Sequence, residues 1–263
     1  MRLALVQQSV DRDLAANLRR GLAAVRTAAA GGASLVVFPE LAFTQFFPQV
    51  PRCGPPPLEL AETIPGPTTD AFSTLARELG VAVVLNLYER DGDRAFDSSP
   101  VIDADGSLLG VTRMLHIAEM EGFHEQGYDT PGDRGTPVYA TRAGRLGVAI
   151  CYDRHYPEVM RALGLGGADL VVVPQAGSVG EWPDGLFEAE LRVASFQNGY
   201  FAALANRVGR DGALEFAGES FVCDPDGRVI ARAPAGSDHI LLADLDLSRT
   251  ATSHARRHFF PDL

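Results

Sequence analysis

The sequence predicts an α/β protein built as a four-layer α-β-β-α sandwich, in which two mixed sheets pack face to face and helices cover the outside. Three observations lead to this prediction. Short apolar strands alternate with amphipathic helices, a hairpin follows each such run, and the second half of the chain repeats the order of the first. We therefore expect internal pseudo-symmetry within a single domain that spans residues 1–263.

The first half opens with alternating strands and helices. Leu3–Gln7 is a short apolar run that predicts a buried strand, and Asp13–Ala30 carries Leu14, Leu18, Leu22 and Val25 at helical spacing. Leu35–Phe38 predicts a second strand, Asp70–Leu79 a second helix and Val81–Leu87 a third, continuous strand. This alternation is typical of layered sheet-and-helix folds.

Two segments of the first half depart from the alternation. Residues 43–67 contain seven prolines and show no clear period, which predicts a long loop of the kind that shapes a site. Further along, SSPVIDADGSLLGVT (98–112) places an Asp-Gly pair between two apolar runs and so predicts a hairpin.

The second half repeats this order. RLGVAIC predicts a strand that ends at Cys151, followed by a helix over Tyr156–Leu163, a strand in GGADLVVVPQ, a helix over Gly185–Asn198 and a strand over Phe201–Ala205. FVCDPDGRVIA contains a second Asp-Gly hairpin. GGASLVVFPE (31–40) and GGADLVVVPQ (166–175) are identical at seven of ten positions, which favours two similar halves over chance similarity between buried strands.

Composition and charge exclude several classes of protein. An apolar fraction of 46% and a charged fraction of 22% are ordinary for a globular protein. The 34 acidic residues outnumber the 23 basic ones and give a formal charge of −11, which argues against a nucleic-acid partner or an anionic membrane surface. All the Lys+Arg residues are arginines, so the chain contains no lysine.

The positions of the cysteines and the hydropathy of the chain exclude further classes of protein. The three cysteines at 53, 151 and 223 are widely spaced and fit neither a disulfide framework nor a zinc ribbon. We expect no metal and no cofactor. No apolar run approaches the ~20 residues that a membrane helix needs, and the chain opens directly on a strand. We therefore expect a cytoplasmic protein without a membrane partner.

Two side chains stand out as candidates for chemistry. Cys151 closes a predicted strand and precedes a turn into a helix, where backbone N–H groups favour a thiolate and an oxyanion; the alternative is a buried, inert cysteine. Glu40 ends a buried strand of the first half, as a pocket base or as a surface residue at a strand end.

An ordered set of motifs favours the functional interpretation of both residues. VVFPELAFTQFFP, IPGPTTD, VIDADGSLLG, TPGD, GVAICYDRHYPE, GGADLVVVP and GESFVCDPDGRVIA follow one another from residue 36 to 231. Together they resemble the nitrilase superfamily of carbon–nitrogen hydrolases over nearly the whole chain. Within it the chain is most similar to the N-carbamoyl-amino-acid amidohydrolases, through FPELAFTQFFP, the Asp-Arg pair after the cysteine, and FQNGYFAALANRVG.

The resemblance implies a Glu–Lys–Cys triad with a second glutamate beside it. It assigns the general base to Glu40, the nucleophile to Cys151 and the second glutamate to Glu125 in GFHEQGYDTPGD. The lysine position falls in RMLH, where this chain has Met114. Lysine would stabilise the oxyanion and lower the pKa of the cysteine, whereas methionine offers neither charge nor a donor.

The loss of lysine raises the question of which groups replace it. We expect His116, on the same face as Met114, and the backbone N–H of Tyr152 to be available as donors. We also expect one of the two glutamates to hold a proton at neutral pH, because two carboxylates beside a thiol repel each other and raise its pKa.

Three further residues are candidates for substrate binding. Arg154 stands where the amidohydrolase branch holds a substrate carboxylate, and an ion pair with a helix glutamate is the alternative. His124 lies either in the pocket or in a solvated loop, and Trp182 either lines the pocket or packs within a loop.

The predicted activity is hydrolysis of a non-peptide carbon–nitrogen bond, in a small amide or N-carbamoyl substrate, through a cysteine thioester-type intermediate. The alternative is a small-molecule binding or regulatory protein that keeps the fold without the chemistry. The resemblance also implies a homodimer or a higher even-numbered homo-oligomer, because members of the family pair through helices that follow the nucleophile strand. In this chain the predicted helix there carries an apolar stripe formed by Tyr156, Val159, Met160 and Leu163. The competing interpretation is that this stripe packs on its own sheet.

Overall fold

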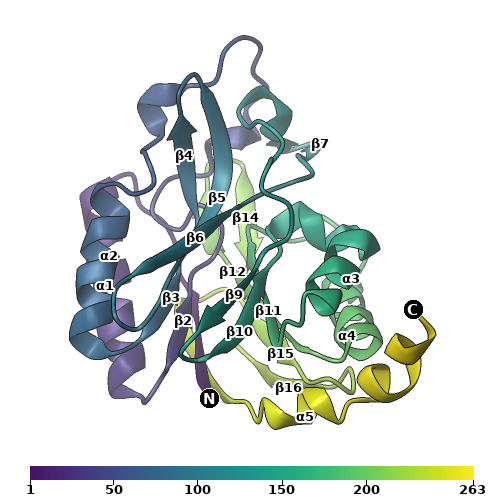
Figure 1. Cartoon of the computed structure of the whole chain (residues 1–263). Coiled ribbons are helices and arrows are strands. Elements are labelled where there is room, and N and C mark those ends of the chain that lie inside the picture. The colour runs from purple at the N-terminus through teal and green to yellow at the C-terminus, as the bar shows by residue number, and fades with distance from the viewer.

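The computed structural model describes residues 1–263 and has the four layers that the sequence predicts (Figure 1). Three clusters of buried apolar side chains define these layers. The largest cluster lies between the two sheets, the second between the first sheet and helices α1 (Leu14–Ala30) and α2 (Pro67–Leu79), and the third between the second sheet and helices α3 (Pro157–Leu165) and α4 (Leu186–Asn198). The α-β-β-α sandwich is confirmed.

The first sheet has the strand order β17-β1-β2-β3-β5-β4, and β6 pairs with β5. Its strands are β1 (Arg2–Gln7), β2 (Leu35–Val37), β3 (Ala82–Val84), β4 (Leu87–Asp91), β5 (Arg94–Ile102), β6 (Leu108–Arg113) and β17 (His239–Asp244). The central strands β1, β2 and β3 run parallel, and β5 and β17 pair antiparallel to β3 and β1.

The second sheet has the order β16-β15-β12-β11-β10-β9. Its strands are β9 (Val138–Thr141), β10 (Gly144–Val148), β11 (Leu170–Gln175), β12 (Phe201–Asn206), β15 (Phe221–Cys223) and β16 (Val229–Arg232). Again three central strands, β10 to β12, are parallel, and a hairpin pairs antiparallel to the third. The two sheets thus share one topology, with β2 and β11 at equivalent places.

Alternation along the strands explains the layering. In β1, Leu3 and Leu5 pack between the sheets, whereas Ala4 and Val6 pack under α1 and α2. Neighbouring side chains of a strand point to opposite faces, and here both faces are covered, which is why these strands are apolar throughout.

Smaller elements complete the chain. They are the hairpins β7 (Glu119–Met120) with β8 (Phe123–His124) and β13 (Val208–Asp211) with β14 (Leu214–Ala217), the helix α5 (Ser248–Ala251), 3-10 turns at 47–49, 58–60, 125–127, 151–155 and 260–262, and a π-helical turn at 255–259. The turns at 47–49 and 58–60 are the only helical elements between Phe43 and Ile64, so the predicted long loop is present up to the start of α2.

Two predicted strands end earlier than expected. The run Val81–Leu87 is broken between β3 and β4, because the Asn86 side chain accepts a hydrogen bond from the Leu41 N–H (2.7 Å) and donates one to Asp97. The strand before Cys151 ends at Val148, and Cys151 begins a 3-10 turn instead. Both breaks place polar groups at the ends of the central strands.

The apolar stripe of α3 packs on its own sheet. Val159, Met160 and Leu163 are buried in the cluster between α3, α4 and the second sheet. The expectation that this stripe forms a subunit interface is therefore wrong, because its side chains are already covered within one chain.

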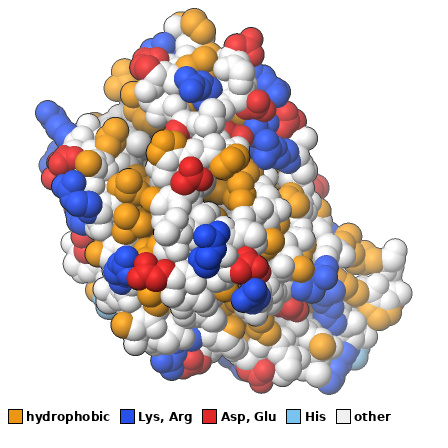
Figure 2. All heavy atoms as spheres, turned by 60° about the vertical axis from the view of Figure 1, so that its left-hand side comes forward, with side chains coloured by type: hydrophobic (Ala, Val, Ile, Leu, Met, Phe, Trp, Pro, Cys, Tyr) orange, Lys and Arg blue, Asp and Glu red, His pale blue; other side chains and the backbone are white.

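The surface carries both signs of charge. On the side that Figure 2 brings forward, acidic and basic side chains lie intermingled with apolar ones and are not segregated by sign. None of the helices is long and apolar enough to cross a membrane.

Candidate active site

Cys151 lies at the C-terminal end of β10, where the chain leaves the second sheet. Its backbone has φ of +42°, a left-handed conformation that non-glycine residues rarely adopt, and it starts the 3-10 turn 151–155. The side chain is 5% exposed and packs in the cluster between the two sheets. Strained backbone conformations of this kind cluster at functional sites, where they fix the position of a side chain.

Glu40 reaches the same place from the first sheet, three residues after the end of β2. It is 1% exposed, and its carboxyl lies close enough to the Cys151 thiol and the Asp97 carboxyl for both groups to shift its pKa. Burial raises the pKa of Glu40 well above its usual value, and the charges of Asp97 and Glu125 raise it further. Two buried carboxyls this close together favour a state in which one of them carries a proton.

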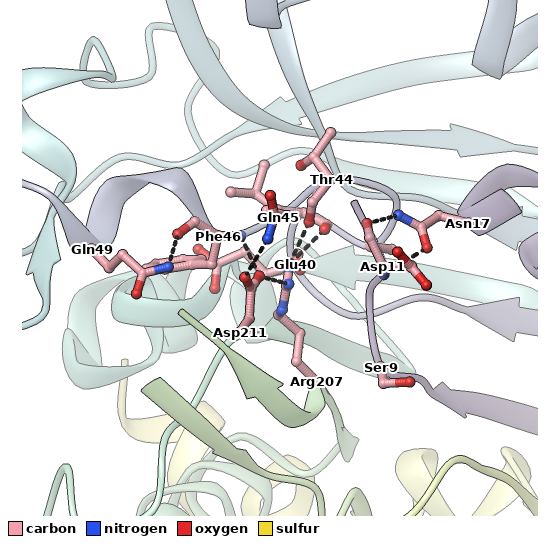
Figure 3. Close-up of polar contacts among 12 residues, drawn as sticks. Ser9, Asp11, Asn17, Glu40, Thr44, Gln45, Phe46, Gln49, Arg207 and Asp211 are labelled. Atoms are coloured by element: carbon pink, nitrogen blue, oxygen red, sulfur yellow. Dashed lines mark hydrogen bonds and ion pairs between the residues drawn. The ribbon is translucent and has the colours of Figure 1, made fainter. Parts of the chain in front are cut away.

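Buried Arg207 holds the backbone of the segment that carries Glu40 (Figure 3). One guanidinium nitrogen of Arg207 donates to the carbonyl oxygens of Leu41 (2.7 Å) and Thr44 (3.1 Å), and the other pairs with Asp211 at 2.9 Å. Asp211 in turn accepts from the Phe46 N–H at 2.7 Å. This network fixes the course of residues 40–46 and so the position of the Glu40 carboxyl.

Glu125 is the second glutamate at the site and is 2% exposed. One carboxyl oxygen accepts from the Ala118 N–H at 3.1 Å, and the other, Oε1, has no partner. Burial raises its pKa to about 8, with the Asp97 charge adding to the shift. A pKa of about 8 favours the protonated form of Glu125 at neutral pH.

Met114 is 1% exposed and belongs to the same buried cluster as Cys151. Its backbone N–H donates to the Asp97 carbonyl at 2.9 Å, and its carbonyl accepts from Gly132 at 2.7 Å. The side chain places a thioether at the lysine position, with no charge and no donor.

His116 is held on the far side of the nucleophile turn. Its Nδ1 lies 2.8 Å from Asp153 Oδ1, and its ring stacks on Tyr156 with centroids 3.4 Å apart. Asp153 also accepts the backbone N–H groups of Leu115 and His116. His116 thus ties the segment that carries Met114 to the turn that carries Cys151, and only Nε2 is left for another partner.

Arg154 is paired within the protein. Its Nη1 donates to the Cys151 carbonyl (3.0 Å) and to Gln175 Oε1 (2.8 Å), and its Nε lies 3.2 Å from Glu190 of α4. Of the two interpretations of Arg154, the structure contains the ion pair with a helix glutamate. Nη2 and the Gln175 Nε2 are buried without partners. Gln175 occupies in the second half the place that Glu40 has in the first.

The remaining candidates, Trp182, Tyr152 and His124, contact neighbouring side chains. Trp182 donates from Nε1 to Glu181 at 2.8 Å and meets His155 edge-on at 4.9 Å, and the Tyr152 ring packs against His155 from another side at 5.1 Å. His124 Nδ1 lies 2.7 Å from Glu119 Oε1 within the β7–β8 hairpin.

Three acidic residues at the site were missed by the sequence analysis. Asp97 on β5 is 4% exposed, Asp129 follows Glu125, and Glu181 lies in the loop after β11. Burial raises the pKa of Asp97 to about 7 and that of Asp129 well above its usual range. An aspartate inside the otherwise apolar and small-residue strand AFDSS was the signal that could have identified Asp97.

The neighbouring charges also shift the pKa of the Cys151 thiol. Burial raises the pKa of Cys151 well above its ordinary value, Glu40, Glu125 and Glu181 raise it further, and only Arg154 opposes them. In the unliganded protein Cys151 is therefore a neutral thiol at neutral pH, and it needs a base or a positive charge to become a nucleophile.

The raised carboxyl pKa values make stability depend on pH. A carboxyl whose folded pKa exceeds its unfolded value stabilises fully below the unfolded pKa and loses that contribution as pH rises through the folded pKa. We expect the free energy of unfolding to fall between about pH 5 and pH 8, the range set by Asp97 and Glu125. Glu125→Gln should flatten this slope in denaturant titrations, whereas the exposed control Glu121→Gln should not. An unchanged slope in Glu125→Gln would contradict the assignment.

The chain was compared with known proteins. A family model described as carbon-nitrogen hydrolase matches residues 2–255. The citrullinase of Francisella tularensis is 31% identical over 260 residues, which cover 94% of this chain and 90% of that protein. The N-carbamoylputrescine amidase of Arabidopsis thaliana is 31% identical over 258 residues, which cover 92% of this chain and 85% of that protein.

Solved structures agree with these relatives. A carbon-nitrogen hydrolase from Helicobacter pylori has a TM-score of 0.88 and 29% sequence identity and covers 99% of this chain and 93% of its own. A mutant of the amidase from Nesterenkonia sp. has a TM-score of 0.81 and 26% identity, covers 99% of each chain, and shows Michael addition of acrylamide at the active-site cysteine.

Proposed function

This chain belongs to the carbon-nitrogen hydrolase family, and we propose that it hydrolyses a carbon–nitrogen bond of a small amide or N-carbamoyl compound with Cys151 as the nucleophile. The observation that carries the proposal is the close approach of the Cys151 thiol and the Glu40 carboxyl, two buried groups that arrive from different sheets. Such a pair is the minimum that nucleophilic catalysis by cysteine needs.

The proposed reaction has two stages. Glu40 accepts the thiol proton while the Cys151 sulfur adds to the substrate carbon, and the same proton then passes to the departing nitrogen. Water, deprotonated by Glu40, next attacks the thioester-type intermediate and releases the acid and the free thiol. The backbone N–H of Tyr152, in the first turn after the nucleophile, is the donor proposed for the developing oxygen charge.

The N-carbamoyl class is supported by the relatives and by Arg154. The relative from Arabidopsis thaliana is named for an N-carbamoyl substrate, as an N-carbamoylputrescine amidase. The buried Arg154 Nη2 has no partner, so one donor beside the Cys151 carbonyl remains for a substrate oxygen. His155 next to it is held by Glu190 and Trp182. We propose that Trp182 closes this end of the pocket.

Covalent trapping tests the proposal. After incubation with fluoroacetamide or acrylamide, intact mass and peptide mapping should show one adduct on Cys151, and ammonia should appear from at least one member of an amide and N-carbamoyl panel. Cys151→Ala should lose both signals, whereas the exposed control Cys53→Ala should keep them. A wild-type chain that binds panel members but forms no adduct and releases no ammonia would support the binding-protein alternative and overturn the proposal.

Assembly is a separate expectation. A groove of about 550 Å³ lies between α3 and α4 and is lined in part by Val193 and Ala194 of α4, with Val193 52% exposed. We expect a homodimer or a higher even-numbered assembly to cover these side chains. Light scattering at micromolar concentration measures this directly, and Val193→Arg should shift the mass towards the monomer. A monomeric wild-type chain would contradict it.

A further inference from the structure

The chain that follows β6 forms a closed loop. Its two ends meet where the Gly132 N–H donates to the Met114 carbonyl at 2.7 Å, and we call this meeting point the neck of the loop. The first limb, residues 114–118, begins with Met114, and the second limb, residues 125–133, begins with Glu125. Both side chains are buried at the site, so the attachment of the loop influences where they lie.

An ion pair attaches the neck to the first sheet. Arg113, the last residue of β6, is 1% exposed, and its Nη1 lies 2.9 Å from Asp133 Oδ1. The rest of the guanidinium is bonded to β4, because Nε and Nη2 donate to Glu89 at 2.8 and 2.7 Å and Nη2 also donates to Asp91 at 2.8 Å. Within the second limb, only Asp133 makes ion pairs.

A close backbone approach makes glycine necessary at the neck. A Cβ atom on Gly132 would lie 2.5 Å from the Arg113 carbonyl oxygen and 2.8 Å from that of Met114, which is closer than real Cβ atoms come. Two residues earlier, the Thr130 N–H donates to the Ala95 carbonyl of β5 at 2.8 Å. The TPGD motif thus holds the second limb against the first sheet and against the end of β6.

The Glu125 side chain has no attachment of its own to either sheet. Its Oε2 accepts the Ala118 N–H at 3.1 Å, its backbone N–H donates to the Ala118 carbonyl at 3.0 Å, and its Oε1 is buried without a partner. These bonds join Glu125 to the first limb of the same loop. The carboxyl therefore moves with the loop, and its place at the site depends on how the loop is held.

The two limbs are held at different places. The first limb is bonded to Asp153 in the turn of the nucleophile, through the N–H groups of Leu115 and His116. The second limb reaches the first sheet through Thr130, through the Tyr128 carbonyl and through Asp133. Only the Asp133 contact is charged, and its partner is a buried guanidinium that is itself fixed by other bonds.

From this arrangement we propose that Asp133 is a positioning residue for the reaction, because its ion pair with Arg113 holds the loop, and with it Glu125, in place at the site. The inference rests on the function proposed above and adds a residue that acts on the same site without touching the substrate. A shift of about 1 Å in a group at a reacting centre can cost about 10²-fold in rate, so a fixed attachment has a large effect.

Asp91 provides a matched control. Asp91 and Asp133 pair with the same guanidinium at 2.8 and 2.9 Å, their side chains are 50% and 42% exposed, and Arg94 lies 3.8 and 3.2 Å from them. Asp91 ends β4, whereas Asp133 belongs to the loop. Asp91→Asn and Asp133→Asn therefore remove the same kind of charge contact, and only the second variant loosens the loop.

Hydrogen exchange measures the attachment of the loop without turnover. In Asp133→Asn we expect the amides of residues 125–132, the Gly132 N–H among them, to exchange at least about fivefold faster than in the wild type, because a hydrogen bond to a charged group is lost. Asp91→Asn should leave their exchange unchanged. Equal exchange of these amides in the two variants overturns the proposal.

Kinetics measure whether the attachment acts through Glu125. Asp133→Asn should lower kcat about tenfold, Asp91→Asn should stay within about twofold of the wild type, and Asp133→Glu, which keeps the charge, should recover most of the rate. Asp133→Asn combined with Glu125→Gln should be no slower than Glu125→Gln alone, because loosening the loop cannot displace a carboxyl that is already removed. Losses that multiply in the double variant overturn the proposal.

A second variant disturbs the neck by a different route. Gly132→Ala pushes the neck away from β6 without removing a charge, and it should lower kcat and speed exchange in the same residues as Asp133→Asn does. An active wild type with Asp133→Asn and Gly132→Ala as fast as Asp91→Asn overturns this inference alone. A wild type that forms no adduct at Cys151 and releases no ammonia overturns the proposed function, and the positioning role fails with it.

Discussion

Cys151→Ala is expected to lower kcat/KM for carbon–nitrogen hydrolysis by about 10⁴-fold or more, because removal of the nucleophile from a group of residues that act together removes most of their joint effect. Glu40→Gln should reach a similar loss, since the amide keeps the shape of the side chain but cannot take the thiol proton. The double variant should be little worse than either single one, and ammonia release under saturating and limiting substrate measures all three.

Substitution of the other two cysteines provides controls for the loss of activity in Cys151→Ala. Cys53 is exposed and lies in the long loop, so Cys53→Ala should retain the full rate. Cys223 is buried in the cluster under α4, so Cys223→Ala reports the effect of a lost buried thiol away from Glu40. Cys151→Ala with an unchanged circular dichroism spectrum and undiminished kcat/KM would contradict the assignment of the nucleophile.

Arg207→Met is expected to destabilise the protein by about 3–5 kcal/mol, because it leaves the Asp211 charge buried without its partner. Both side chains are almost fully buried, and Arg207 also bonds the carbonyl oxygens of Leu41 and Thr44. Since those bonds hold the segment that carries Glu40, kcat should fall as well, under conditions where the variant is still folded.

Arg210 provides the matched control for this prediction. It is exposed on neighbouring β13, and Arg210→Met should change the free energy of unfolding by no more than about 0.5 kcal/mol. Arg207→Lys keeps the charge but not the planar fork and should lie between the two in denaturant titrations. Equal stabilities of Arg207→Met and Arg210→Met would show that the buried network does not hold residues 40–46.

The layers of the fold could be predicted because they follow from apolar alternation. Strands such as Leu3–Gln7 and Leu35–Phe38 are apolar on both faces, and each is followed by a helix with one buried side. The repeated GGA-LVV-P pattern also predicted that the sheets share a topology, with β2 and β11 at matching places. Strand β17 was missed, because its return to β1 is a pairing over nearly the whole chain length.

The site could be predicted only in part. Glu40, Glu125 and Cys151 were placed together by the resemblance to a family, and the structure brings them into one buried region. The break at Asn86 could not be predicted, because it depends on side-chain bonds to Leu41 and Asp97, which are remote in sequence. The interface expected on α3 failed because an apolar stripe looks the same in sequence whether it meets its own sheet or another chain.

The placement of the base and the nucleophile on different sheets has a consequence for how the protein is made. Glu40 belongs to the first half of the chain and Cys151 to the second, and only the docking of the two sheets brings their side chains into contact. During synthesis most strands of the first sheet are made before Cys151, and the sheet is completed only by β17, the last strand to be translated. A chain in which the two sheets have not docked therefore holds the Cys151 thiol without the carboxyl that is proposed to activate it.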